Sequence, residues 1–136
     1  MANPVLLLHG FTGSVSSTWK PTGLIELLQE AGREVIAIDL PGHGTAVKHH
    51  DPKAYADMEE GLIEELPEGM VDGVGFSMGA RTLLCMAAIA PHKFGKLVVA
   101  GVGRNLFERD EAQAERIAKG VQGEADPGDV HAQTFA

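Results

Sequence analysis

The sequence predicts an α/β fold: a doubly wound, mainly parallel sheet of about four strands with helices on both faces. The first observation is a set of apolar runs that are continuous rather than alternating, which is typical of parallel strands covered on both faces. The second is that segments with helical periodicity lie between these runs. The third is a length of 136 residues, the size of one domain. Together they predict a strand-helix alternation with right-handed crossovers.

The strands are expected in order at residues 5–8, 35–39, 70–76 and 96–101. Between the first two, residues 24–31 have an apolar face and end at Gly32, which is a common helix stop. Both features fit a strand-helix-strand unit.

The second expected helix begins at Asp51-Pro52, an N-cap followed by a proline in the first turn. Its apolar positions follow helical spacing and are Tyr55, Met58, Leu62 and Leu66. The third helix, residues 82–90, is apolar nearly all round, so we expect it to be buried, together with the thiol of Cys85. The fourth, residues 110–121, is polar with a weak apolar side.

Three short motifs follow the first three strands: His9-Gly10-Phe11, then Asp39-Leu40-Pro41-Gly42-His43-Gly44, then Gly75-Phe76-Ser77-Met78-Gly79. In doubly wound sheets ligands bind beyond the carboxyl ends of the strands. Because all three motifs lie at such ends, the topology predicts that they surround one crevice.

The third motif has the context of a nucleophile elbow, because a strand precedes it and a helix follows. Ser77 must stand on a sharp turn, and side chains at Gly75 and Gly79 would collide with the neighbouring strand and helix. The simpler alternative is that Ser77 only caps the helix that follows it.

In order and spacing, the motifs resemble the α/β-hydrolase fold family, in its serine-nucleophile, esterase-like branch, over nearly the whole chain. The resemblance implies that Ser77 is a nucleophile and that the backbone N–H groups of Phe11 and Met78 form the oxyanion hole. It implies that His9, beside Gly10, holds the oxyanion loop by hydrogen bonds and is not the base.

Two more residues are expected near this pocket. His43 is predicted as a turn residue at the rim. Arg81 lies one turn beyond Ser77, either on the surface or facing the pocket. In a menaquinone-biosynthesis lyase branch of the family, an arginine that follows a similar elbow holds substrate carboxylates.

The chain departs from the family pattern after its fourth strand, where members continue to the strands that carry the acid and the histidine. We therefore expect residues 1–105 to form a truncated core and residues 106–136, a helix and a tail, to resemble the start of a cap segment. The family's strand order would leave residues 96–101 as an apolar edge, which invites pairing. A homodimer or a complementing chain is the expected partner.

The tail offers one candidate base, His131, with Asp129 or Asp126 to orient it; a disordered or cap-derived tail is the alternative. Asp110 is a further acid candidate, and its simpler interpretation is an N-cap of the helix that follows.

The sequence thus predicts a serine hydrolase, an esterase or thioesterase acting on a small-molecule acyl substrate. The alternatives are a menaquinone-pathway-type lyase and a truncated or split module without catalysis.

Scattered histidines predict no metal, and no cofactor is expected. A net charge of −8 without basic clusters argues against nucleic-acid and membrane partners. One cysteine and no signal-like segment favour the cytoplasm.

Overall fold

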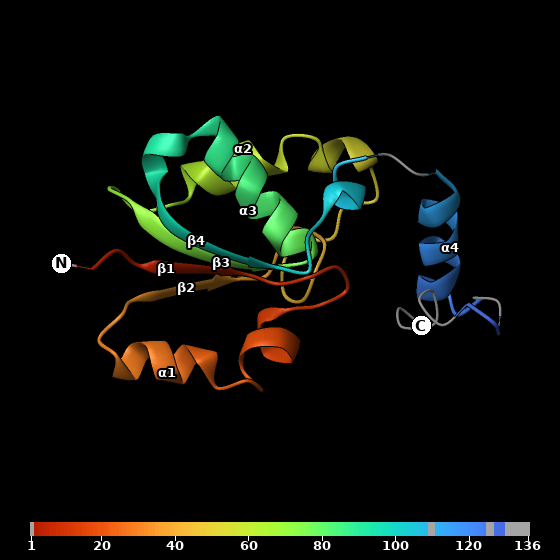
Figure 1. The fold of residues 1–136 in the computed structure, drawn as a ribbon. Coiled ribbons are helices and arrows are strands. Elements are labelled where there is room, and N and C mark those ends of the chain that lie inside the picture. The colour runs from red at the N-terminus through yellow and green to blue at the C-terminus, as the bar shows by residue number, and fades with distance from the viewer. Residues whose placement is uncertain (1, 109–110, 125–126, 130–136) are drawn as a thin grey trace. The chain divides into compact units, whose positions relative to one another are not determined.

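The computed structural model describes residues 2–108, 111–124 and 127–129, which fall into two compact units, Met1–Val102 and Gly103–Ala136. The first unit is built on a four-stranded parallel sheet in the order β2-β1-β3-β4 (Figure 1). The strands are β1 (Val5–Leu8), β2 (Val35–Ile38), β3 (Val71–Phe76) and β4 (Phe94–Ala100). The predicted fold class is confirmed.

Helices cover both faces of the sheet: α1 (Leu24–Glu30) lies on one face, and α2 (Met58–Glu64) and α3 (Met78–Ile89) lie on the other (Figure 1). The central strand β1 divides the core, because successive strand residues point to opposite faces. Leu6 and Leu8 are fully buried in the cluster that α2 and α3 complete. Leu7 is buried in the second cluster, with Trp19 and residues of α1.

Among the described residues, the shorter elements are a π-helical turn (Val15–Trp19) and three 3-10 turns (Pro52–Tyr55, Pro91–Lys93 and Arg104–Leu106). The π-helical turn was not predicted; Ser14 and Ser17 cap it reciprocally through side chain and backbone. In the second unit, α4 spans Glu111–Val121. In the part of the chain that the structure describes, every helix is too short or too polar to cross a membrane.

The helix predicted after Asp51 is divided in two. The Asp51 carboxylate caps its start, as predicted, by accepting from the backbone N–H of Lys53. The first turn then closes with 3-10 bonds, and α2 begins only at Met58 and ends at Glu64. Leu66 consequently lies beyond the helix. Tight 3-10 turns of this kind are common at helix ends, and apolar spacing alone does not reveal them.

The prediction that the helix over residues 82–90 is buried holds for one face of the helix and is wrong for the others. Leu83 and Met86 of α3 are fully buried against the sheet, whereas Ile89 is 50% exposed. Cys85 is half-buried rather than part of the core. The reason is that the helix packs through one face only, and composition does not reveal which neighbours the other faces have.

The strand β4 lies at the edge of the sheet, as expected. Val98 pairs with Val74, which packs against the core on the α1 side, so both side chains point to the face that carries α1. Val98 is nevertheless 61% exposed, because α1 covers the sheet over β1 and β2. A homodimer or complementing chain over this edge stays a prediction.

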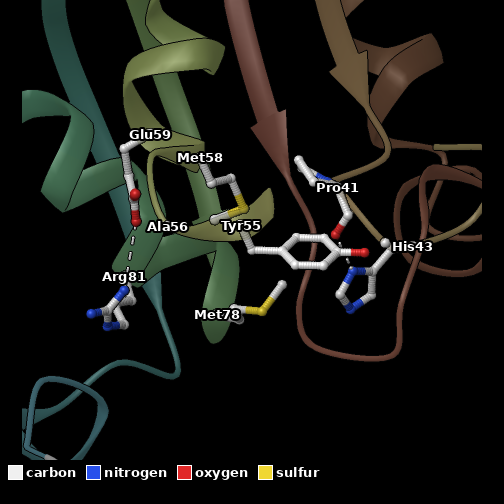
Figure 2. A pocket seen from close by; sticks show the side chains of 9 residues that line it. Pro41, His43, Tyr55, Ala56, Met58, Glu59, Met78 and Arg81 are labelled. Carbon is white, nitrogen blue, oxygen red and sulfur yellow. Dashed lines mark hydrogen bonds and ion pairs between the residues drawn. The ribbon is translucent and has the colours of Figure 1, made fainter. Parts of the chain in front are cut away.

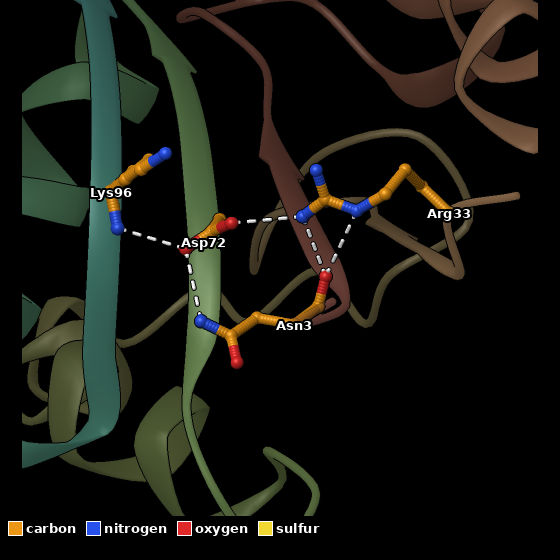
Figure 3. A network of polar contacts seen from close by, with 4 residues as sticks. All are labelled: Asn3, Arg33, Asp72 and Lys96. Carbon is orange, nitrogen blue, oxygen red and sulfur yellow. Dashed lines mark hydrogen bonds and ion pairs between the residues drawn. The ribbon is translucent and has the colours of Figure 1, made fainter. Parts of the chain in front are cut away.

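A polar network ties the amino ends of the strands together (Figure 3). The Asp72 carboxylate of β3 accepts from the Arg33 guanidinium at 2.8 Å, from the Lys96 backbone N–H at 2.8 Å and from the Asn3 amide at 3.2 Å. The bond from Lys96 is the main cause that lowers the pKa of Asp72. The three motifs lie at the opposite, carboxyl ends of the strands.

Candidate active site

Ser77 occupies a sharp turn between the last residue of β3 and the first residue of α3. Its φ of 53° and ψ of −116° are a conformation that residues other than glycine rarely adopt, and such strain is typical of functional sites. The backbone N–H of Ser77 donates to the Ala100 carbonyl at 2.9 Å, which fixes the turn to β4. The Ser77 side chain makes no capping hydrogen bond to α3, so the helix-cap alternative lacks its defining contact.

Close backbone packing explains the two flanking glycines. A Cβ at Gly79 would overlap the carbonyl oxygens of Leu8 and His9. A Cβ at Gly75 would lie 2.7 Å from the Cα of Ala80, which is too close for non-bonded carbons. The elbow therefore requires glycine at both positions because backbone, rather than a movable side chain, fills the space.

The loop after β1 lies directly against the elbow. A Cβ at Gly10 would be 3.4 Å from the Cβ of Ser77 and 3.2 Å from the ring of Phe76. This brings the backbone of the first motif next to the serine. The N–H of Met78 lies at the N-terminus of α3, where backbone donors have no partner within the helix.

His9 is completely buried and uses both ring nitrogens. Its Nε2 accepts from the Leu40 backbone N–H at 2.9 Å, so Nδ1 must carry the proton, which it donates to the Gly10 carbonyl at 2.7 Å. Burial is the main cause that lowers the pKa of His9, which favours this neutral form. The side chain thus connects the first motif to the second and has no nitrogen left for Ser77.

The turn of the second motif is held by Asp39. Its carboxylate accepts from the backbone N–H groups of Thr45 and Val15, both at 2.8 Å, and from the Thr45 hydroxyl at 2.8 Å. The bond from the Thr45 backbone is the main cause that lowers the pKa of Asp39 to about 2. Asp39 therefore fixes the loop between β2 and α2 to the loop after β1.

The pKa of Asp39 yields a pH-dependence prediction. Because its folded pKa lies below the usual 3.8, its contribution to stability is complete above pH 3.8 and is lost as the pH falls toward about 2. We expect Asp39→Asn to lower the free energy of unfolding by about 1–2 kcal/mol at neutral pH and to flatten the acid dependence in that window. Urea unfolding across this range measures both effects.

Asp57→Asn is the matched control for this prediction, because Asp57 is exposed and its side chain makes no capping bond to α2. An acid dependence of Asp39→Asn that equals that of the unchanged chain would contradict the prediction.

A pocket of about 600 Å³ lies beside the elbow (Figure 2). That volume is in the range of small-ligand sites. Met78, the residue after Ser77, forms part of its wall, as do residues of the second motif and of the segment around the start of α2. The complete lining is Pro41, Gly42, His43, Tyr55, Ala56, Met58, Glu59, Met78 and Arg81.

The structure brings most of the predicted site residues to this region. His43 lines the pocket, and its ring centroid lies 5.2 Å from that of His9 and 5.7 Å from that of Phe11. Arg81 also lines the pocket, although its side chain is 40% exposed; its guanidinium lies 3.7 Å from the Glu59 carboxylate. The catalytic roles of these residues stay predictions.

Sequence reasoning missed part of the pocket wall. Tyr55 and Met58 were assigned only to the apolar side of a helix, and Glu59 was not singled out. These three residues follow the second motif closely along the chain, and that motif is a turn at the carboxyl end of β2. This closeness in sequence is the signal from which a shared pocket could have been predicted.

Most of the predicted acid and base candidates beyond the core cannot be placed relative to Ser77, because they fall outside the residues that the structure describes. His131, Asp126 and Asp110 lie outside the described residues. Asp129 is described, and its two carboxylate oxygens accept from Arg116 at 2.7 and 2.9 Å within the second unit. Asp129, with Asp126, was one of the two residues predicted to orient His131, and that role stays a prediction.

Comparison with known proteins gives consistent matches. The alpha/beta hydrolase fold family matches residues 3–133. An esterase of Mycobacterium tuberculosis is 33% identical over 109 residues, which cover 77% of this chain and 35% of that protein.

Among solved structures, that of the Mycobacterium tuberculosis esterase is 28% identical with a TM-score of 0.64 and covers 90% of this chain and 40% of its own. A hydrolase from a deep-sea metagenome library has a TM-score of 0.72 at 21% identity, a likeness of fold alone, and covers 90% of this chain and 43% of its own. The chain therefore spans less than half of the length of each of these proteins.

Proposed function

This chain belongs to the α/β-hydrolase fold family, and from this premise we propose that it is a serine hydrolase, an esterase or thioesterase that acts on small acyl substrates. One observation carries the proposal: Ser77 stands at the carboxyl end of the central part of the sheet, on a strained turn that two tightly packed glycines permit. The pocket beside it offers room for an acyl group. The activity of the named relatives adds support, although the chain spans only part of them.

In the proposed reaction, the Oγ of Ser77 attacks the carbonyl carbon of the ester while a base takes its proton. The backbone N–H groups of Met78 and Phe11 donate to the developing oxyanion, and each such donor is worth about 3 kcal/mol. The alcohol or thiol leaves with a proton, and an acyl ester of Ser77 remains. Water then attacks this ester, and the acid product and free Ser77 result.

The base is the open part of this proposal. His9 is not a candidate, since both of its ring nitrogens hold backbone groups. We propose that the base comes from the tail, where His131 is the candidate, or from a second chain. Asp129 or Asp126 would orient His131, and the Asp129 carboxylate, which accepts two bonds from Arg116, retains lone pairs for a further donor.

Covalent labelling tests the nucleophile. We expect a fluorophosphonate to modify Ser77, identified by mass spectrometry of the labelled peptide, and we expect Ser77→Ala to lose both the label and p-nitrophenyl acetate turnover. Ser16→Ala is the matched control, because Ser16 is an exposed serine of the same unit, and it is expected to leave labelling unchanged.

The same assay examines the base and the non-catalytic alternative. If His131 is the base, His131→Ala lowers turnover by about 1000-fold, whereas unchanged turnover assigns the base to another group. If Ser77 stays unlabelled at high reagent concentration, the hydrolase proposal fails and a binding module without catalysis is favoured.

A lyase of the menaquinone-pathway type is the second candidate, and one observation favours it. Arg81 lines the pocket, where its guanidinium could hold a substrate carboxylate. Its ion pair with Glu59 weakens this reading, because an anionic substrate would have to compete with a carboxylate of the chain itself.

A further inference from the structure

The pocket beside the elbow is apolar in its middle and polar at its ends. Figure 2 shows the ring of Tyr55 and the side chains of Met58 and Met78 between His43 on one side and the Arg81–Glu59 pair on the other. The Tyr55 hydroxyl accepts from the backbone N–H of His49 at 2.7 Å and donates to the carbonyl of the same residue at 3.0 Å. The hydroxyl is therefore engaged outside the pocket, and Tyr55 contributes mainly an aromatic surface.

The charged end of the pocket carries one positive and one negative group. The guanidinium of Arg81 and the carboxylate of Glu59 are 3.7 Å apart, so their opposite charges largely cancel at a ligand group that lies well away from the pair. The side chain of Glu59 is 16% exposed and that of Arg81 is 40% exposed. Because water screens a buried charge less, the carboxylate is the stronger influence on a group inside the pocket.

We propose that Glu59 determines the substrate preference of this pocket: it offsets Arg81 and restricts the site to esters of uncharged, apolar acyl groups. The proposal rests on the proposed hydrolase function for its catalytic readout. An acyl chain that ends in a carboxylate would lose its hydration, meet the Glu59 carboxylate and gain little net attraction from a paired Arg81. An uncharged acyl chain contacts the two thioethers and the aromatic ring without that cost.

The ratio of kcat/KM for p-nitrophenyl butyrate to kcat/KM for mono-p-nitrophenyl succinate tests the proposal on the full chain. We expect Glu59→Gln to lower this ratio about tenfold, since it removes the negative charge and retains the shape of the side chain. Arg81→Gln should raise the ratio, because it leaves the carboxylate in place and removes the cation. The control is Glu60→Gln, which changes the net charge equally at an exposed neighbouring position of α2 and should leave the ratio unchanged.

A binding measurement separates this proposal from the hydrolase proposal. In a Ser77→Ala background, hexanoate and adipate are titrated while the methyl resonances of Met58 and Met78 are followed by NMR. We expect hexanoate to bind more tightly than adipate, and Glu59→Gln to tighten adipate binding about tenfold. Two results would overturn the role proposed for Glu59, even if Ser77 proves reactive. One is that Glu59→Gln and Glu60→Gln change adipate affinity equally. The other is that the methyl resonances of Met58 and Met78 respond to neither ligand. If the ester assay is silent and the titration behaves as expected, only the hydrolase proposal fails.

Discussion

Gly79→Ala is expected to lower the free energy of unfolding by about 3 kcal/mol or more, which is a large part of the total stability of a domain of this size. The added Cβ would overlap the carbonyl oxygens of Leu8 and His9. Both are main-chain atoms of the buried central strand and its loop, so no side-chain rotation relieves the overlap. Either β1 or the start of α3 must shift, and each shift opens the core that both elements share. Thermal unfolding followed by circular dichroism measures the loss.

The chain contains a matched control for this prediction. Gly61 lies within α2, and a Cβ there would meet no atom within 4 Å. We expect Gly61→Ala to raise the free energy of unfolding by about 0.5–1 kcal/mol, because alanine restricts the unfolded chain and favours the helix. The prediction fails if the two alanine variants melt at similar temperatures.

The contrast between these glycines shows what the sequence could predict about the elbow. Two glycines spaced around Ser77, between an apolar strand and an apolar helix, indicate a sharp turn with close backbone packing. The strands were predictable for the same kind of reason, since a buried parallel strand such as β1 is apolar at every position. The position of β4 at the edge of the sheet could be predicted only from the resemblance to the α/β-hydrolase family, because no single segment encodes the strand order.

The pocket wall was harder to predict because it depends on which segments meet. Tyr55 follows helical spacing with Met58, yet the two belong to different elements, a 3-10 turn and α2. The Tyr55 hydroxyl pairs with the backbone of His49, a contact that residue type does not indicate. Likewise, the pairing of Arg81 with Glu59 joins α3 to α2, and it appears only when the two helices are placed on the sheet.

His9→Ala is expected to combine a loss of stability of about 3 kcal/mol with a loss of kcat/KM of about 100-fold. The substitution leaves the Leu40 N–H and the Gly10 carbonyl without the imidazole and opens a cavity in a fully buried position. The loop that carries the N–H of Phe11 then loses the tie that His9 makes to Leu40 of the second motif, and the bond from the Val15 N–H to Asp39 remains. Urea unfolding measures the first effect, and p-nitrophenyl acetate turnover measures the second, which rests on the proposed function.

Two isosteric variants separate the bonds of His9. In His9→Gln the amide oxygen can still accept from the Leu40 N–H, whereas in His9→Asn the amide nitrogen can still donate to the Gly10 carbonyl. If the donation to Gly10 positions the oxyanion loop, His9→Asn retains more activity than His9→Gln at comparable stability. His92→Ala, at an exposed position, is the control and should change neither quantity. Equal activity of the Asn and Gln variants would contradict the positioning argument.

The buried imidazole also makes stability depend on pH. Burial lowers the pKa of His9 in the folded chain below its ordinary value of 6.5, so the unfolded chain binds more protons in the interval between the two values. The contribution of neutral His9 is therefore complete above pH 6.5 and is lost as the pH falls through the folded pKa. His9→Gln has no group that titrates there, so the difference in melting temperature between this variant and the unchanged chain should shrink as the pH is lowered below 6.5. If this difference in melting temperature stays constant across the interval, His9 does not change its protonation on unfolding. That result would contradict the neutral tautomer that the two hydrogen bonds require.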